Sequence, residues 1–133
     1  MAFRLVSSGP VKNCEVALTP SKSVSNRALI IRALCKDQFG IENLSTSSDT
    51  EVLMNALNSE SSELNVNDAG TAFRFLVAYL SIQSGTFVLS GSERMKQRPV
   101  GPLVEALRTL GAEIEYSGTT GFPPLKISGR QLE

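Results

Sequence analysis

The segment 70–82 is apolar at nearly every position, and Arg74 is its only charged residue. An apolar run of this length predicts a buried helix, because such a helix is stable only where neighbouring elements cover it. Asp68 lies just before the run and is expected to cap the first turn of the helix. The rest of the chain must therefore supply layers that pack around this helix.

Short strands and helices alternate along the rest of the chain. Strands are expected at residues 14–18, 38–44, 64–66, 86–89, 112–116 and 124–127. Further helices are expected at residues 23–35, from Ser48 to Leu57, and from Pro99 in the first turn to Gly111 as the C-terminal stop. This alternation predicts an α/β fold, α+β in some schemes, in which helices pack on sheets.

A weak internal repeat supports that architecture. Placing Arg27 over Arg74, 47 residues later, superimposes the order helix, strand, loop, helix and aligns residues 38–44 with residues 85–91. Identity between the two copies is low, so duplicated βα units and chance similarity both remain open.

The composition excludes several kinds of site. Lys and Arg number 13, as do Asp and Glu, so no net charge attracts nucleic acid or a membrane, and any cationic patch has to be local. The chain contains no histidine. A Ser-His-Asp triad, a Cys-His pair and a His-ligated metal are therefore excluded, and acid–base chemistry would depend on lysines or carboxylates.

Cysteine spacing and hydropathy bear on location. Cys14 and Cys35 are not in a CxxC motif, so we expect core thiols in a reducing compartment rather than a metal or redox site. No apolar run approaches the ~20 residues of a membrane span, and the first residues lack the apolar core of a signal peptide. The expected location is the cytoplasm.

Positive side chains gather at the expected starts of three helices. The first start, Ser-Lys-Ser-Val-Ser-Asn-Arg at residues 21–27, places Ser23 and Arg27 one turn apart on one face. Lys22 at a helix N-terminus costs ~0.3–1 kcal/mol unless something negative compensates. Free N–H groups, hydroxyls and a lysine together favour an anion site. The alternative is a simple serine cap with solvated basic residues.

The second start reads Asp-Ala-Gly-Thr-Ala-Phe-Arg and ends at Arg74. Gly70 would let a ligand approach the backbone, Thr71 offers a hydroxyl, and Arg74 lies one turn beyond Gly70. As the lone charge of an apolar helix, Arg74 needs a partner. That partner is either a ligand anion or a carboxylate of the chain, such as Asp68 or Glu93.

The third start, residues 91–99, contains Arg94, Lys96 and Arg98 at alternate positions, which would point the same way in an extended loop. Charge runs in loops are usually solvated surface. Neither GxxxxGK[ST] nor GxGxxG is present, so ATP and dinucleotide sites have no support. The three starts together indicate a site for small anions.

These three motifs, in this order and approximate spacing, resemble the N-terminal part of the 5-enolpyruvylshikimate-3-phosphate synthase family, the 3-phosphoshikimate 1-carboxyvinyltransferases. The resemblance covers nearly the whole chain and continues through Val-Gly-Pro-Leu-Val at residues 100–104. The sister UDP-N-acetylglucosamine enolpyruvyl transferases lack the Ser-Lys-Ser…Asn-Arg pattern. Family members are about three times longer, with two domains built from βαβαββ units and an active site between them.

The resemblance implies that residues 1–133 are an incomplete N-terminal portion of such a protein. Residues 1–10 would form a strand of the opposite domain, residues 11–66 a first, shortened unit, and residues 67–133 a second unit. The implied reaction transfers the enolpyruvyl (carboxyvinyl) group from phosphoenolpyruvate to the 5-hydroxyl of shikimate 3-phosphate and releases phosphate, on the way to chorismate and the aromatic amino acids. It needs neither a metal nor an organic cofactor.

The resemblance also assigns roles at the three helix starts. Lys22 would contact both substrates, with Ser23 and Arg27 on the shikimate carboxylate side. Gly70 would line the phosphoenolpyruvate pocket, and Arg98 would hold its phosphate. The full expected substrate-binding set is Lys22, Ser23, Arg27, Gly70, Thr71, Arg74 and Arg98. The family's acid–base carboxylates lie beyond Glu133, so no catalytic residue is expected within this chain.

The expected partners are the two anionic substrates and the missing C-terminal domain of the same protein, with neither nucleic acid nor a membrane. On this interpretation the chain alone is inactive. A second hypothesis is a non-catalytic anion-binding or assembly module that reuses the fold. A third, nucleic-acid binding through the basic loop, is disfavoured by the neutral charge and the two tyrosines.

Overall fold

The structure is a computed structural model that describes residues 17–35 and 39–130, together with Arg4, Val6, Gly9 and Glu15. Its elements, in chain order, are α1 (Lys22–Leu34), α2 (Ser48–Leu57), β1 (Glu63–Asn65), α3 (Gly70–Ser81), β2 (Gly85–Ser90), the 3₁₀ turn η1 (Met95–Gln97), α4 (Gly101–Thr109), β3 (Glu113–Tyr116) and β4 (Leu125–Gly129). The predicted α/β class with helices packed on a sheet is confirmed.

The four strands form one mixed sheet in the order β1-β2-β4-β3. Strand β1 is parallel to β2, whereas β4 runs antiparallel to both β2 and β3. Together with α3 and α4, which alternate with the strands, they make one βαβαββ unit. In β4, Leu125 and Ile127 are buried and Lys126 is exposed, which is the alternation of a strand with one face on the core.

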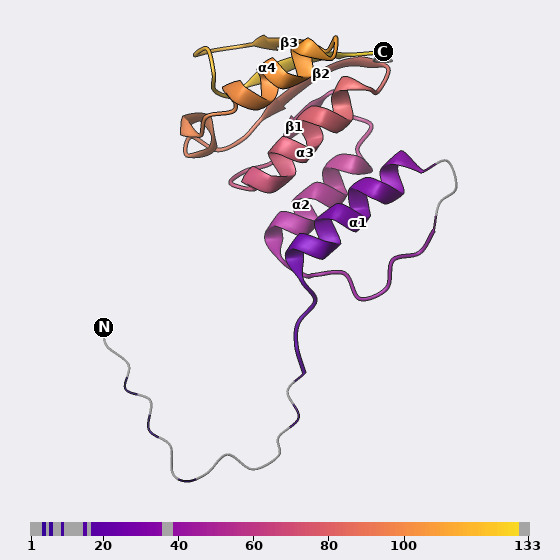
Figure 1. Ribbon diagram of the computed structural model, residues 1–133, viewed down its shortest axis with the longest axis vertical. Coiled ribbons are helices and arrows are strands. Elements are labelled where there is room, and N and C mark those ends of the chain that lie inside the picture. The colour runs from indigo at the N-terminus through magenta and orange to yellow at the C-terminus, as the bar shows by residue number, and fades with distance from the viewer. Residues whose placement is uncertain are drawn as a thin grey trace.

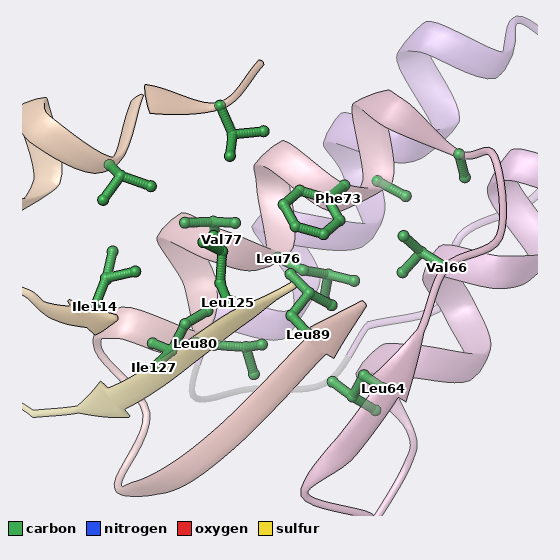
Figure 2. Close-up of a cluster of buried hydrophobic side chains, with 14 of the residues drawn as sticks. Leu64, Val66, Phe73, Leu76, Val77, Leu80, Leu89, Ile114, Leu125 and Ile127 are labelled. Atoms are coloured by element: carbon green, nitrogen blue, oxygen red, sulfur yellow. The ribbon is translucent and has the colours of Figure 1, made fainter. Parts of the chain in front are cut away.

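Helix α3 lies between the sheet and the pair α1 and α2 (Figure 1). Four of its side chains, Phe73, Leu76, Val77 and Leu80, are buried against the sheet residues Leu89, Leu125 and Ile127 (Figure 2). Burial of each such side chain stabilises the fold by about 1.5–3 kcal/mol. Cover from two sides explains why the sequence of α3 is apolar over so much of its surface.

All four helices begin at the same end of the molecule, the left end in Figure 1. For α3 and α4 this polarity follows from the βαβ arrangement, in which each helix runs opposite to the parallel strands that it connects. Helices α1 and α2 share the direction although residues 39–47 between them form no strand. The three cationic segments therefore lie at one end of the fold.

Helix α1 also has a face that no described element covers. Val24, Ile31 and Leu34 are 65%, 56% and 52% exposed, whereas Leu29 on the opposite side is fully buried. Cys35 is an exposed free thiol. The expectation of a core thiol is therefore wrong for Cys35, because Cys35 is the C-cap of α1 and follows the exposed Leu34; Cys14 lies outside the described residues.

Two expected strands are not observed in the described part of the chain. Residues 39–44 are irregular, and Asn43 has a φ of 57°, a left-handed conformation that interrupts an extended strand. The strand match in the internal repeat is therefore wrong, although its helices α1 and α3 are both present. Of residues 14–18, Ala17 and Leu18 are exposed and lie outside any strand, and Cys14 and Val16 lie outside the described residues.

The predicted start of the last helix is also corrected. Helix α4 begins at Gly101 with Pro102, not Pro99, in its first turn. The carbonyl of Gly121, in the β3–β4 loop, accepts hydrogen bonds from the backbone N–H groups of Val100 (2.8 Å) and Gly101 (3.1 Å). A contact with this distant loop thus fixes where α4 starts.

Asp68 does not cap α3. The N-cap position is Ala69, whose side chain makes no capping hydrogen bond, and the Asp68 carboxylate instead accepts a hydrogen bond from the Ser92 hydroxyl.

The division of the chain into residues 1–10, 11–66 and 67–133 stays a prediction. Within residues 17–35 and 39–130, no helix is long and apolar enough to cross a membrane.

Candidate anion-binding site

The start of α1 is held by a serine cap and an ion pair. The Ser21 hydroxyl accepts a hydrogen bond from the Val24 backbone N–H at 3.4 Å. The ammonium of Lys22 donates to Oδ2 of Asp49, in the first turn of α2, at 2.9 Å. This carboxylate supplies the compensation that a lysine at a helix N-terminus requires. The serine cap that sequence reasoning left as an alternative is therefore present, but Lys22 is paired rather than merely solvated.

Arg27 folds back over the first turn of α1. Its Nη1 atom donates to the backbone carbonyl of Ser23 at 3.0 Å and also to the Ser23 hydroxyl. The predicted i, i+4 proximity of these two residues is therefore observed. Both are exposed, so a hydroxyl and a guanidinium face solvent together beside Lys22.

The start of α3 brings two arginines to one glycine. Arg74 donates from Nη1 to the carbonyl of Gly70 at 3.0 Å and from Nη2 to the carbonyl of Pro99 at 3.2 Å. Nη1 of Arg98 lies 3.5 Å from the carbonyl oxygen of Asp68. A Cβ atom on Gly70 would clash with Nη1 of Arg98 and lie 3.3 Å from Nη1 of Arg74. Only a residue without a side chain leaves both guanidinium groups this close to the helix start.

Arg74 is exposed, which corrects the expectation of a buried arginine. The carboxylates proposed as its partners are engaged elsewhere, Asp68 with Ser92 and Glu93 with Lys96. Among the described residues, no ion pair involves Arg74 or Arg98. Two guanidinium groups with only neutral carbonyl partners, beside a helix N-terminus without a side-chain cap, form a positive site.

The basic loop before α4 is not extended. It forms the turn η1, in which Met95 is buried and Lys96 pairs with Glu93 at 2.7 Å. The expectation that Arg94, Lys96 and Arg98 point the same way is therefore wrong, because the apolar side chain of Met95 draws the loop into the core. Arg98, after the turn, is the residue of this group that reaches Gly70.

The loop is fixed against the start of α3 by Ser92. Its backbone N–H donates to the carbonyl of Asn67 at 3.1 Å, and its hydroxyl donates to the Asp68 carboxylate. Gly91 packs against the same carbonyl, at a distance that a side chain could not keep. These contacts place the loop, and with it Arg98, beside α3.

A cavity of about 210 Å³ lies between the starts of α2 and α3. Its lining residues are Ser48, Asp49, Val52, Val66, Asn67, Asp68 and Ala69. Asp49 at one side of the cavity pairs with Lys22, and Asp68 at the other side borders Arg98. The cavity therefore connects the cationic residues at the start of α1 with the arginines beside the start of α3. Sequence reasoning treated Asp49 as part of a helix start and missed its pairing with Lys22, which only the packing of α1 on α2 creates.

The βαβαββ unit, with Arg74 and Arg98 beside the start of α3, agrees with the enolpyruvyl transferase class of α/β proteins, to which the family match assigns the chain. The chain belongs to the EPSP synthase (3-phosphoshikimate 1-carboxyvinyltransferase) family, whose model matches residues 8–133. A 3-phosphoshikimate 1-carboxyvinyltransferase of Bacteroides fragilis strain YCH46 is 48% identical over 132 residues, which is 99% of this chain and 32% of the relative. One from Bordetella pertussis is 43% identical over 141 residues, covering 89% of this chain and 32% of the relative.

The EPSP synthase structure of Acinetobacter baumannii matches the fold with a TM-score of 0.75 at 24% identity, over 82% of this chain and 30% of that one. The chain therefore spans about a third of the length of the relatives it matches. The roles of Lys22, Ser23, Arg27, Gly70, Thr71, Arg74 and Arg98 in binding substrate stay predictions.

Proposed function

We propose that this chain is the N-terminal part of a 3-phosphoshikimate 1-carboxyvinyltransferase. The reaction joins the enolpyruvyl group of phosphoenolpyruvate to the 5-hydroxyl of shikimate 3-phosphate and releases inorganic phosphate. The names of the relatives and the family support the reaction. The chain alone, which holds the expected binding residues and not the acid–base carboxylates, would bind substrate without turning it over.

One observation carries the proposal: Arg74 and Arg98 converge on Gly70 with no carboxylate partner among the described residues. A phosphate group with several acceptor oxygens matches two guanidinium groups and the first N–H groups of a helix. We assign the phosphate of phosphoenolpyruvate to this position. Thr71 is exposed in the same turn and offers a hydroxyl.

The start of α1 is assigned to shikimate 3-phosphate. Ser23 and Arg27 are hydrogen-bonded to each other and exposed, which suits a ligand that carries both hydroxyl and carboxylate groups. Lys22 would lie between the two substrates, because its partner Asp49 borders the cavity that leads to the arginines beside the start of α3.

These positive groups would act on both binding and rate. Their positions are fixed by helix starts and backbone carbonyls before any substrate arrives, so little reorganisation is needed. As the C–O bond to phosphate breaks, its electron pair leaves with the phosphate oxygen, and preorganised cations stabilise that growing negative charge in the transition state.

The remaining two thirds of the protein is the proposed partner of α1. Val24, Ile31 and Leu34 are large apolar side chains that the described residues leave exposed on one side of α1, with Arg27 among them. Apolar patches of this kind usually mark an interface. We also propose that the protein works in the cytoplasm, where the exposed thiol of Cys35 would stay reduced.

The test joins this chain to the remaining two thirds of the Bacteroides fragilis relative. We expect this hybrid protein to release phosphate from phosphoenolpyruvate in the presence of shikimate 3-phosphate, whereas the 133-residue chain alone does not. Arg98→Ala should raise the KM for phosphoenolpyruvate about tenfold or more, because a charged hydrogen bond is worth about 1.5–3 kcal/mol. Arg94→Ala is the control, since Arg94 is exposed and, unlike Arg74 and Arg98, is not among the residues nearest Gly70.

A folded hybrid without phosphate release would contradict the proposal, and so would an Arg94→Ala effect equal to that of Arg98→Ala. Substrate binding by the 133-residue chain, combined with an inactive hybrid, would favour the non-catalytic anion-binding module instead.

A further inference from the structure

We infer that Asn26 and Thr50 are positioning residues that set where Lys22 meets Asp49. This inference rests on the proposed function of Lys22. Asn26 on α1 is 0% exposed and Thr50 on α2 is 2% exposed. The Thr50 hydroxyl donates to Oδ1 of Asn26 at 2.8 Å, so a buried side-chain hydrogen bond joins the second turn of α1 to the first turn of α2.

A chain of hydroxyl groups extends this contact into the loop before α2. Oγ of Ser47 lies 3.0 Å from Oγ1 of Thr50. Since Thr50 gives its single hydroxyl hydrogen to Asn26, the Ser47 hydroxyl is the donor in this pair. The Ser25 hydroxyl accepts from the Ser45 backbone N–H at 2.9 Å. Two adjacent residues of α1 thus hold the segment that leads into α2.

The buried contact lies directly behind the ion pair. Lys22 and Asn26 are one turn apart on α1, and Asp49 and Thr50 are neighbours on α2. The side chains of Lys22 and Asp49 are 50% and 26% exposed. Ion pairs with this exposure stabilise the contact between two helices by no more than about 1 kcal/mol. The hydrogen bond between Asn26 and Thr50 is the buried side-chain hydrogen bond between α1 and α2 that lies nearest in sequence to this ion pair, and we assign to it the placing of Lys22 against α2.

Asn26 also has an unpaired donor. Its Nδ2 atom is buried and has no hydrogen-bond partner among the described residues. A buried donor without an acceptor destabilises a fold, and an apolar side chain of similar size would avoid that cost. Asn26→Leu therefore separates an effect of this amide on position from an effect on stability.

The experiment uses the hybrid protein with Thr50→Val, Thr50→Ser and Asn26→Leu. Valine keeps the shape of threonine and removes the hydroxyl, and serine restores the hydroxyl. We expect Thr50→Val and Asn26→Leu to raise the KM for shikimate 3-phosphate about tenfold, since a misplacement of about 1 Å can cost as much as about a hundredfold and a shift of Lys22 would be smaller. Thr50→Ser should stay within about twofold of the parent. Thr46→Val, at an exposed threonine in the same loop, is the matched control.

Two further readouts separate position from stability. Asn26→Leu should leave the urea midpoint unchanged or raised while it raises KM. In an Asp49→Asn background, Thr50→Val should have no further effect on KM, because Thr50 acts through Asp49. A Thr50→Val variant that lowers only the urea midpoint, or whose KM effect is just as large in the Asp49→Asn background, would overturn the inference.

Crystal structures of the hybrid and of its Thr50→Val variant test the inference without activity. We expect Lys22 and Asp49 to separate beyond ion-pair distance in the variant only. An ion pair that persists in the variant would overturn the inference even in a protein that releases no phosphate. An inactive hybrid whose ion pair separates in the variant would refute the proposed function and leave the positioning role intact.

Discussion

The ammonium of Lys22 lies 2.9 Å from Oδ2 of Asp49, and this contact joins the N-terminal turns of α1 and α2. A lysine at the start of one helix and an aspartate at the start of the next compensate each other, because the aspartate is favourable at its own helix end and neutralises the lysine. At the start of α3, by contrast, Arg74 and Arg98 have carbonyl partners only. The two halves of the candidate site therefore differ in how their charge is balanced.

The first prediction concerns Lys22. Lys22→Met should change the free energy of unfolding by no more than about 1 kcal/mol, because the pair is half exposed. Under the proposed function the same change should weaken binding of shikimate 3-phosphate at least tenfold in the hybrid, measured by calorimetry. Lys126→Met is the control, since Lys126 is equally exposed and pairs with Glu115 on the sheet. Equal losses of affinity in both variants would contradict the assignment of Lys22.

A second prediction concerns Gly70. Gly70→Ala places a methyl group where Nη1 of Arg98 now lies, so the flexible guanidinium must move. Stability should change by less than about 1 kcal/mol, since only the end of a side chain is displaced and alanine favours a helix. The KM for phosphoenolpyruvate should rise, with kinetics of the hybrid as the measurement. Gly118→Ala, in the β3–β4 loop, should leave KM unchanged; an unaltered KM in Gly70→Ala would place the phosphate elsewhere.

A third prediction concerns the core. Phe73 of α3 is fully buried between the sheet and the neighbouring helices. Phe73→Ala should lower the free energy of unfolding by about 3–5 kcal/mol, because the change removes buried apolar surface and leaves a cavity. Urea denaturation of the hybrid checks this value. Phe39→Ala is the control, since Phe39 is 45% exposed, and a cost as large as that of Phe73→Ala would contradict the described packing.

A fourth prediction concerns the exposed face of α1. If the rest of the full-length protein covers Ile31, Ile31→Glu should destabilise the hybrid by several kcal/mol, because a carboxylate would be buried without a partner. In the 133-residue chain alone the same change should leave stability unaltered and reduce self-association, measured by analytical ultracentrifugation. Equal stability of the parent and variant hybrids would mean that Ile31 stays in solvent.

Local signals in the sequence predicted much of the fold. The apolar period and the glycine stop predicted α1, α3 and the end of α4 within one or two residues, because helix ends depend on neighbouring residues. Alternation predicted β2, β3 and β4. Residues 39–44 have the same kind of pattern and form no strand, because a strand also needs a neighbour to pair with.

The candidate site likewise combines features that local sequence predicts with contacts that only tertiary packing creates. The sequence by itself determined that Lys22, Arg27 and Arg74 stand in the first two turns of helices, since that follows from spacing along one segment. Only the tertiary structure decided that Asp49 meets Lys22, that Asp68 binds Ser92 instead of capping α3, and that Arg98 reaches Gly70. These contacts join residues that are 24 to 30 positions apart. Such contacts depend on how helices and loops pack, and no local pattern encodes that packing.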